Sequence, residues 1–184
     1  MAGVGKTLRV VALLCLLALL GCTPARGGPV SSPPPTAASQ TPTESAQERQ
    51  ERLDYAAAEK AYRTFRAEYN RVLRAGGAKE PTKVMKATAG GPYLAELTEI
   101  SQAYAGLGLH SDGVERIGYV RRVGYSSKEI SLEVCEDSSR VRDVDRAGKV
   151  RGKGEVRTTS IEIKRTASGW KVWSGNGKKV STCT

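Results

Sequence analysis

The sequence predicts an α+β fold in which N-terminal helices pack on an antiparallel sheet. Two observations carry this prediction. Before residue 108, apolar residues recur every three or four positions, which is the period of an amphipathic helix. After Ser111 the apolar period changes to two, which is typical of half-buried strands. Since each predicted element has one apolar face, the helices are expected to cover one face of the sheet.

The helical half is expected to hold three helices. The first runs from Arg49 to Arg74, a stretch without proline or glycine, and Gly76 and Gly77 end it because glycine readily takes a positive φ after the last turn. A second helix is expected over 81–88 and a third from residue 92 on, each opened by a proline. The predicted apolar faces of the first and third helices are Leu53, Ala57, Ala61, Phe65, Tyr69, Val72 and Leu73, and Leu94, Leu97, Ile100, Tyr104 and Leu107.

The strand half shows the alternation of half-buried antiparallel strands. Turns are expected at 126–128, 145–149 and 167–169, where polar residues and glycine interrupt the pattern. The last turn leads directly into a Gly-Trp-Lys-Val segment. The apolar positions of the strands are predicted to be Ile117, Tyr119, Val123, Ile130, Leu132, Val134, Ile161, Ile163, Trp170 and Val172.

The first 22 residues are predicted to direct export. Lys6 and Arg9 precede an apolar run from Val10 to Leu20, and this order is typical of a secretory signal peptide. A helix of that length spans roughly half of a bilayer core of about 30 Å, so the apolar run is too short to form a membrane-spanning helix. The residues Leu19 to Cys22 resemble the lipobox of bacterial lipoproteins, although Leu20 stands where that pattern usually carries a small residue.

This resemblance implies that Cys22 is acylated and becomes the new N-terminus. Residues 1–21 are then a lipoprotein signal peptide, residues 22–48 a lipidated cysteine with a tether, and residues 49–184 the folded domain. The tether is rich in Pro, Ser and Thr and is expected to act as a spacer of roughly 30 to 80 Å. The alternative is an ordinary signal peptide with an incidental cysteine.

Two of the four cysteines are predicted to form a disulfide. Cys15 leaves with the signal peptide and Cys22 carries lipid, which leaves Cys135 and Cys183 in an oxidising compartment. Closing a loop of this size stabilises a small domain by about 4 kcal/mol in the chain-entropy model. The alternative is a pair of buried reduced thiols.

A family resemblance adds to this fold prediction. Several short segments resemble the domain of secreted actinobacterial lipoproteins, and the order of elements resembles the cystatin-like cone fold shared by nuclear transport factor and the polyketide-cyclase relatives. The resemblance implies a curved sheet, a bridge between a strand and the C-terminal tail, and a cone with an open mouth. It covers about residues 55–183 and concerns core and turn positions rather than catalytic signatures. The segments are Ala61-Tyr62-Arg63, Leu132 to Asp137, Val144-Asp145, Gly148-Lys149, Gly169 to Val172 and Cys183.

The sequence predicts no catalytic residue, no metal site and no cofactor. The single histidine, His110, adjoins Ser111 and Asp112, and side chains adjacent in sequence rarely form a catalytic relay, so a surface or capping role is expected. One histidine and few cysteines exclude a histidine-rich or four-cysteine metal centre. The acid pairs at 136–137 and 143–145 are surrounded by arginines and are interpreted as salt-bridged turns.

Two groups of residues are candidates for binding. An aromatic group either lines the cone interior or fills it, and its core spacing favours filling. A basic group is expected to face anionic headgroups or wall polymers, since residues 111–184 hold 16 basic and 10 acidic side chains. The alternative for the basic group is a well-solvated surface. The groups are Tyr62, Tyr69, Tyr104, Trp170 and Trp173, and Arg121, Arg122, Lys164, Arg165 and Lys171.

These observations favour a non-enzymatic accessory or binding module of the cell envelope. The module is held by its N-terminal lipid on the extracytoplasmic side of the membrane of a Gram-positive, actinobacterial cell, with a protein partner that the sequence does not identify. Nucleic-acid binding fits the net charge of +10 but conflicts with the compartment. The alternative is a small-ligand carrier or an enzyme that uses the cone cavity; a third hypothesis is a lipoprotein that blocks a competitor's access. A polar, open cavity with an acid beside a tyrosine favours an enzyme, and a filled cavity favours a module.

Overall fold

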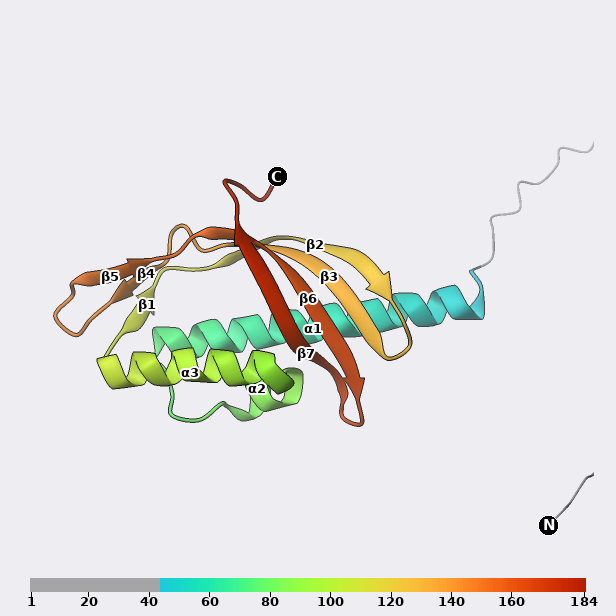
Figure 1. Ribbon diagram of the computed structural model, residues 1–184, viewed down its shortest axis with the longest axis horizontal. Coiled ribbons are helices and arrows are strands. Elements are labelled where there is room, and N and C mark those ends of the chain that lie inside the picture. Colours follow the sequence, from blue (N-terminus) through green and yellow to red (C-terminus); the bar gives the residue numbers. More distant parts are fainter. Residues whose placement is uncertain (1–43) are drawn as a thin grey trace, which may run out of the picture. The chain divides into compact units, whose positions relative to one another are not determined.

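The computed structural model describes residues 44–184 (Figure 1). The predicted signal peptide, Cys22 and most of the tether lie outside these residues. Three helices, α1 (Ala46–Arg74), α2 (Lys83–Thr88) and α3 (Gly91–Leu107), pack on one face of a curved antiparallel sheet. The predicted α+β fold is thus confirmed. None of the helices within 44–184 is long and apolar enough to cross a membrane.

Helix α1 begins at Ala46, earlier than predicted. The Ser45 hydroxyl accepts a hydrogen bond from the Glu48 N–H at 3.2 Å, and the Glu48 carboxylate accepts one from the Ser45 N–H at 2.8 Å. This reciprocal capping box satisfies donors that a bare helix start leaves unpaired. The boundary was misplaced because this capping signal stands inside the tether-like composition.

The helices are rotated slightly from the predicted apolar faces. In α1 the exposed residues include Leu53, which is 50% exposed, and Tyr55 and Tyr62 are buried instead. In α3 the outward residues include Leu107, which is 71% exposed, whereas Tyr93 is buried. The tyrosines are buried in preference to the leucines at the edge of the predicted apolar face, because a large aromatic ring buries more apolar area.

Four long strands form the main sheet. In chain order they are β2 (Arg116–Tyr125), β3 (Glu129–Asp137), β6 (Val156–Thr166) and β7 (Gly169–Lys179), and they are paired antiparallel in the order β2-β3-β6-β7. Irregular pairing interrupts β2 against β3 and β6 against β7, and bulges of this kind bend a sheet. The turns predicted at 126–128 and 167–169 connect these strands as expected.

The core lies between the main sheet and the helices. Its most buried side chains include Tyr62 and Phe65 of α1, Leu132 of β3 and Ile161 of β6, the last two directly paired across the sheet. The core cluster draws side chains from all three helices and from the main sheet, and the described residues lie within one compact unit. A compact unit with its own core is expected to fold by itself.

A second, small sheet was not predicted. It consists of β1 (His110–Asp112), β4 (Arg142–Val144) and β5 (Val150–Lys153) in the order β1-β4-β5. The turn between β4 and β5 lies at the predicted position, where the Asp145 carboxylate accepts hydrogen bonds from the N–H groups of Ala147 and Lys149, both at 2.9 Å. Figure 1 shows this hairpin extending beyond the main sheet, beside the C-terminal end of α3.

A disulfide joins Cys135 of β3 to Cys183 of the C-terminal tail, with Cα atoms 5.6 Å apart. The bridge crosses Gly118 of β2, where a Cβ atom would lie 2.5 Å from the Cβ of Cys183. Only glycine leaves room for the tail at this point. The pairing predicted from the cysteine count is the one that the structure supports.

Candidate functional site

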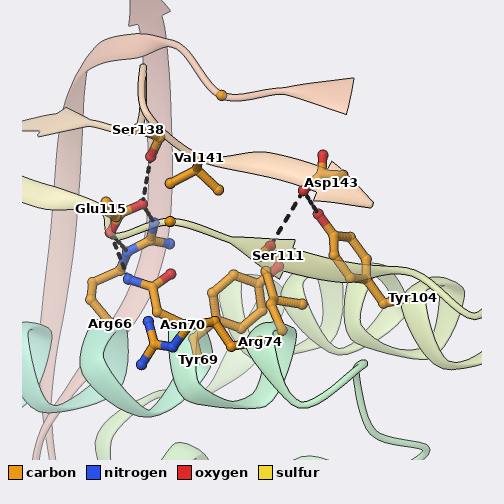
Figure 2. Close-up of a pocket in the computed structure, with 13 residues that line it drawn as sticks. Arg66, Tyr69, Asn70, Arg74, Tyr104, Ser111, Glu115, Ser138, Val141 and Asp143 are labelled. Atoms are coloured by element: carbon orange, nitrogen blue, oxygen red, sulfur yellow. Dashed lines mark hydrogen bonds and ion pairs between the residues drawn. The ribbon is translucent and has the colours of Figure 1, made fainter. Parts of the chain in front are cut away.

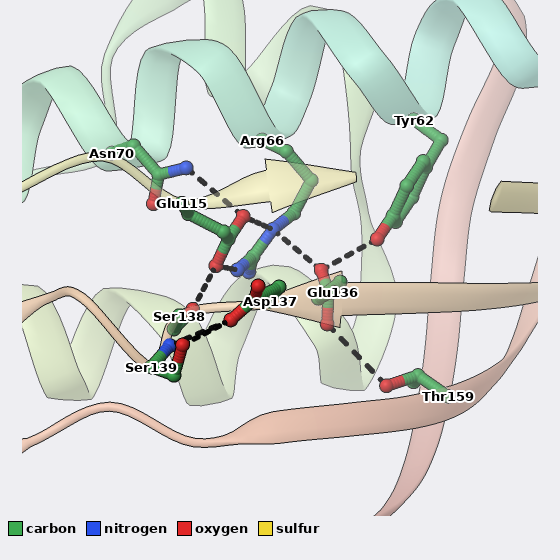
Figure 3. A network of polar contacts seen from close by, with 9 residues as sticks. All are labelled: Tyr62, Arg66, Asn70, Glu115, Glu136, Asp137, Ser138, Ser139 and Thr159. Atoms are coloured by element: carbon green, nitrogen blue, oxygen red, sulfur yellow. Dashed lines mark hydrogen bonds and ion pairs between the residues drawn. The ribbon is translucent and has the colours of Figure 1, made fainter. Parts of the chain in front are cut away.

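A buried ionic network occupies the space between α1 and the main sheet (Figure 3). The Arg66 guanidinium of α1 lies between Glu115, which precedes β2, and Glu136 of β3. Its Nε is 2.8 Å from Glu136 Oε1 and 3.1 Å from Glu115 Oε1. The three side chains are only 7 to 12% exposed. One cation is therefore shared by two carboxyl groups, and all three side chains are largely shielded from solvent.

Neutral donors complete the network. The Tyr62 hydroxyl donates to Glu136 Oε1 at 2.5 Å, while Asn70 and Ser138 donate to Glu115 at 3.0 and 2.9 Å. Tyr62, Arg66 and Asn70 follow one another at intervals of four, so that α1 presents them on one face. Every buried side-chain nitrogen and oxygen in residues 44–184 has a hydrogen-bond partner. The network is fully satisfied.

The network fixes the protonation states of its members. Burial by itself raises the pKa of Glu115, but the charge of Arg66 and the bonds from Arg66, Asn70 and Ser138 outweigh it and lower that pKa below its ordinary value. Burial, together with the charge of Glu136, raises the pKa of Tyr62 far above that of a free tyrosine. Glu115 is thus held as a carboxylate and Tyr62 as a neutral phenol around neutral pH.

A polar cavity of about 170 Å³ opens beside this network, between α1, the end of α3 and the small sheet (Figure 2). Tyr104 of α3 donates to Asp143 Oδ1 at 2.5 Å, and Ser111 of β1 donates to the same oxygen at 3.3 Å. Burial and the bond to Asp143 raise the pKa of Tyr104 to about 12. Arg66, Tyr69, Asn70, Leu73, Arg74, Gly113, Glu115, Ser138, Val141 and Gly154 also line the cavity.

A second hollow of about 350 Å³ shares Arg66, Glu115, Ser138 and Gly154 with the first. Its other lining residues are Glu136, Lys153, Glu155 and Arg157. Members of the ionic network therefore line both hollows.

The aromatic candidates divide between core and cavity. Tyr62 is fully buried and bound to Glu136, whereas Tyr69 and Tyr104 line the cavity. Trp170 and Trp173 lie elsewhere, on β7. Trp170 is buried beneath the Arg165 guanidinium, 4.5 Å from its ring, and Trp173 lies beneath Lys164 at 5.6 Å.

The basic candidates of the main sheet are engaged locally. Arg121 lies 3.4 Å from Glu133, Lys164 lies 3.3 Å from Glu162, and Arg165 is paired with Asp54. The last two candidates make other contacts. The Arg122 guanidinium lies 4.9 Å from the ring of Tyr55, and the Lys171 ammonium donates to the Lys86 carbonyl at 2.7 Å.

The remaining sequence candidates do not form a relay. His110 is exposed on β1, Ser111 donates to Asp143, and Asp112 pairs with Arg142 at 2.6 Å. The interpretation of 143–145 as a salt-bridged turn fits Asp145, which pairs with Arg151 at 2.7 Å. Within residues 44–184, no three His, Cys, Asp or Glu side chains are grouped as metal ligands. Cys22 lies outside the described residues.

Sequence reasoning missed Arg66, Asn70 and Glu115. The sequence held a signal for Arg66 and Asn70, because both lie on the same face of the helix as Tyr62. A charged or amide side chain on an apolar helix face needs a buried hydrogen-bond partner. Nothing local identified Glu115. It lies in a loop 49 positions from Arg66, and only the closure of the main sheet brings the two together.

The comparisons with known proteins concern the arrangement of elements. No protein-family model and no curated protein matches the chain significantly. Among solved structures, the chain is similar to the intermembrane-space region of the chloroplast protein ARC6, at 16% identity and a TM-score of 0.42, over 66% of this chain and 96% of that one.

Two bacterial structures have a comparable likeness. One is an NTF2-like protein with a cystatin-like fold from Novosphingobium aromaticivorans, at 13% identity and a TM-score of 0.42, over 76% of this chain and 92% of that one. The other is a ketosteroid isomerase-like protein from Erwinia carotovora, at 17% identity and a TM-score of 0.42, over 69% and 96%. The likeness lies in helices packed on a curved antiparallel sheet, and the activity in the second name belongs to that protein.

Proposed function

We propose that this protein is a non-enzymatic binding module of the cell envelope, held at the extracytoplasmic face of the membrane by a lipid on Cys22. The observation that carries the proposal is the saturated ionic network of Arg66, Glu115 and Glu136. In a cone that performs acid–base chemistry, an interior group must exchange a proton with a ligand near neutral pH. Here the carboxyl groups of Glu115 and Glu136 are already bound within the protein. Their partners are Arg66, Tyr62, Asn70 and Ser138.

The titratable groups of the interior support the same proposal. The pKa of Glu115 is lowered and those of Tyr62 and Tyr104 are raised, so each is moved away from the neutral range in which a general acid or base operates. The single histidine is exposed on β1, outside the network. Such a network stiffens the scaffold that carries the surface residues.

The anchoring part of the proposal is supported by the sequence and by the disulfide. The segment Leu19 to Cys22 has the lipobox-like order described above, and the Cys135–Cys183 pair suits an oxidising compartment outside the cytoplasm. Lipid anchoring is tested by growing producing cells with labelled palmitate. The wild-type protein is expected to be labelled and recovered with membranes, and Cys22→Ala to lose the label.

The matched control for this experiment is Cys15→Ala, which removes a thiol from the apolar run and is expected to leave the label in place. Retention of the label by Cys22→Ala contradicts the anchor. Loss of the label from both variants indicates that export, rather than acylation of one cysteine, was disturbed, and it removes the support for Cys22.

A small-ligand carrier or an enzyme is the second candidate, because the cavity places the Asp143 carboxylate beside the Tyr104 hydroxyl, the arrangement expected for an enzyme. The cavity volume of about 170 Å³ is comparable with the roughly 150 Å³ that accommodates a benzene-sized molecule. Native mass spectrometry of the protein isolated from its envelope tests this function. A small adduct that disappears in Tyr104→Phe supports a carrier, and an unloaded protein supports the module.

A further inference from the structure

The β4–β5 hairpin separates its charges by sign. Asp143 accepts hydrogen bonds from Tyr104 of α3 and from Ser111 of β1. Asp145 is held by the turn backbone and by Arg151. The cations of the same hairpin are all exposed: Arg140, Arg142, Arg146, Lys149, Arg151 and Lys153. Asp143 and Asp145 are thus bound to groups of the protein itself, and most of the exposed charge on the hairpin is positive.

Several of these cations have no acidic partner. Arg142 pairs with Asp112, and Arg151 pairs with Asp145. Within residues 44–184, the other four hairpin cations make no salt bridge. On the main sheet, Arg121 and Lys164 are each paired with a glutamate of their own or the neighbouring strand, whereas the exposed Arg116, Arg122 and Lys178 make no salt bridge within the described residues. The hairpin is distinguished by having its unpaired cations close together in one short segment, between residues 140 and 153.

Exposed apolar side chains lie at the same end of the molecule. Leu107, the last residue of α3, is 71% exposed, and Val150 at the start of β5 is 49% exposed. Leu107 borders a hollow of about 320 Å³ together with Leu109, Asp145 and Arg151.

The hairpin and the end of α3 are in contact. Arg146 lies directly against Gly108, where a Cβ atom would be 2.6 Å from the Arg146 Nε. We call the residues Leu107, Arg146, Lys149, Val150 and Arg151 the tip surface. Figure 1 shows the β4–β5 hairpin and the C-terminal end of α3 at the opposite end of α1 from the first turn of that helix.

We propose, building on the proposed membrane-anchored function, that the tip surface binds an anionic phospholipid membrane peripherally. Arg146 and Lys149 contact headgroup phosphates, and Leu107 and Val150 enter the boundary between headgroups and acyl chains. Cations surrounding exposed apolar side chains are the composition that such an interface attracts. A soluble phosphate polymer satisfies the cations but offers nothing to Leu107 and Val150, which is why the lipid surface is the better match.

The test uses the segment 44–184, which carries the whole core and the disulfide but neither Cys22 nor the apolar run. Its partitioning is measured by sedimentation at low salt with vesicles of phosphatidylglycerol and phosphatidylcholine, and with phosphatidylcholine alone. Binding only to the anionic vesicles is expected. Since each basic residue near such a surface contributes about 1 kcal/mol, Arg146→Gln with Lys149→Gln is expected to weaken partitioning roughly 30-fold.

The matched control removes the same charge from the main sheet. Arg121→Gln with Lys164→Gln changes the net charge equally and is expected to weaken partitioning by about threefold or less, through the general field alone. Equal losses in the two double variants overturn the proposal, because binding then follows net charge and not the tip surface. Absence of binding by the wild-type segment overturns it as well.

A third variant distinguishes lipid from polymer. Leu107→Ser keeps the charge and, at an exposed position, the fold; a several-fold loss of vesicle binding is expected if the side chain enters the membrane. Unchanged vesicle binding in Leu107→Ser, together with tight binding of soluble polyphosphate, overturns the membrane assignment. These results do not depend on acylation of Cys22, so failure of the tip surface and failure of the anchor are distinguishable.

Discussion

The main sheet and the small sheet use the same kinds of charged residue for opposite purposes. Between α1 and the main sheet, Arg66 is buried with Glu115 and Glu136, and no buried side-chain nitrogen or oxygen of the described residues lacks a hydrogen-bond partner. On the β4–β5 hairpin of the small sheet, Asp143 and Asp145 are hydrogen-bonded within the protein, and Arg146 and Lys149 are exposed. A buried charge must be paired within the protein and so stabilises one arrangement of its neighbours. An exposed charge without a partner can bind another molecule. The interior and the tip surface are therefore expected to respond to mutation in opposite ways.

The largest effect on stability is expected from the interior. Arg66→Met leaves two buried carboxyl groups without their cation and is expected to lower the free energy of unfolding by about 3 to 5 kcal/mol. Urea unfolding of residues 44–184 measures this. The control is Arg63→Met, which removes an exposed pair with Glu59 on the same helix and is expected to cost less than about 1 kcal/mol.

A compensating variant sharpens this prediction. Adding Glu115→Gln and Glu136→Gln to Arg66→Met removes the uncompensated charges, and part of the lost stability is expected to return. If the triple variant loses as much free energy of unfolding as the three single variants together, lost packing rather than unpaired charge destabilises Arg66→Met.

The disulfide is expected to have the next largest effect. Cys135→Ala with Cys183→Ala opens a loop with a sequence separation of 48 and is expected to lower the free energy of unfolding by about 2 to 4 kcal/mol. Reduction of the wild-type protein is expected to produce the same loss, and reductant to have no effect on the double variant. Free thiols in the oxidised wild-type protein under denaturing conditions contradict the pairing.

The fold was predictable from sequence where apolar periodicity extends over many residues. Helix α1 and strands β3 and β6 each span enough residues for a period of 3.6 or 2 to be visible, and the strand turns carry local polar and glycine signals. The small sheet was not predictable, because β1 and β4 have three residues each, too few to display a period. They pair across about 30 positions, for which the sequence carries no local sign.

The candidate site was less predictable than the fold. Tyr62, Tyr69 and Tyr104 were found because aromatic residues at core spacing mark an interior. Their partners Glu136 and Asp143 were interpreted as turn residues, because the neighbouring arginines suggested local salt bridges. In the structure the partners come from distant elements, at sequence separations of 74 for Tyr62 with Glu136 and 39 for Tyr104 with Asp143.

A smaller effect is expected from acid. The pKa of Glu115 in the folded protein lies below its ordinary value of 4.5, so its contribution to stability is complete above that value and is lost as pH falls through the folded pKa. The free energy of unfolding is expected to fall as the pH drops below about 4.5. In Glu115→Gln the slope is expected to be shallower, by at most about 1.4 kcal/mol per pH unit. Parallel curves for the two proteins contradict a charged role for Glu115.

The smallest effect on stability is expected at the tip surface. Arg146→Gln with Lys149→Gln removes exposed charges that have no acidic partner in residues 44–184, so the free energy of unfolding is expected to change by less than about 0.5 kcal/mol. Arg121→Gln, which breaks the exposed pair with Glu133, is expected to cost up to about 1 kcal/mol. Thermal and urea unfolding of the three proteins measure the difference. If Arg146→Gln with Lys149→Gln unfolds as readily as Arg66→Met, these two cations stabilise the fold. That result contradicts the view that they are free to bind a partner.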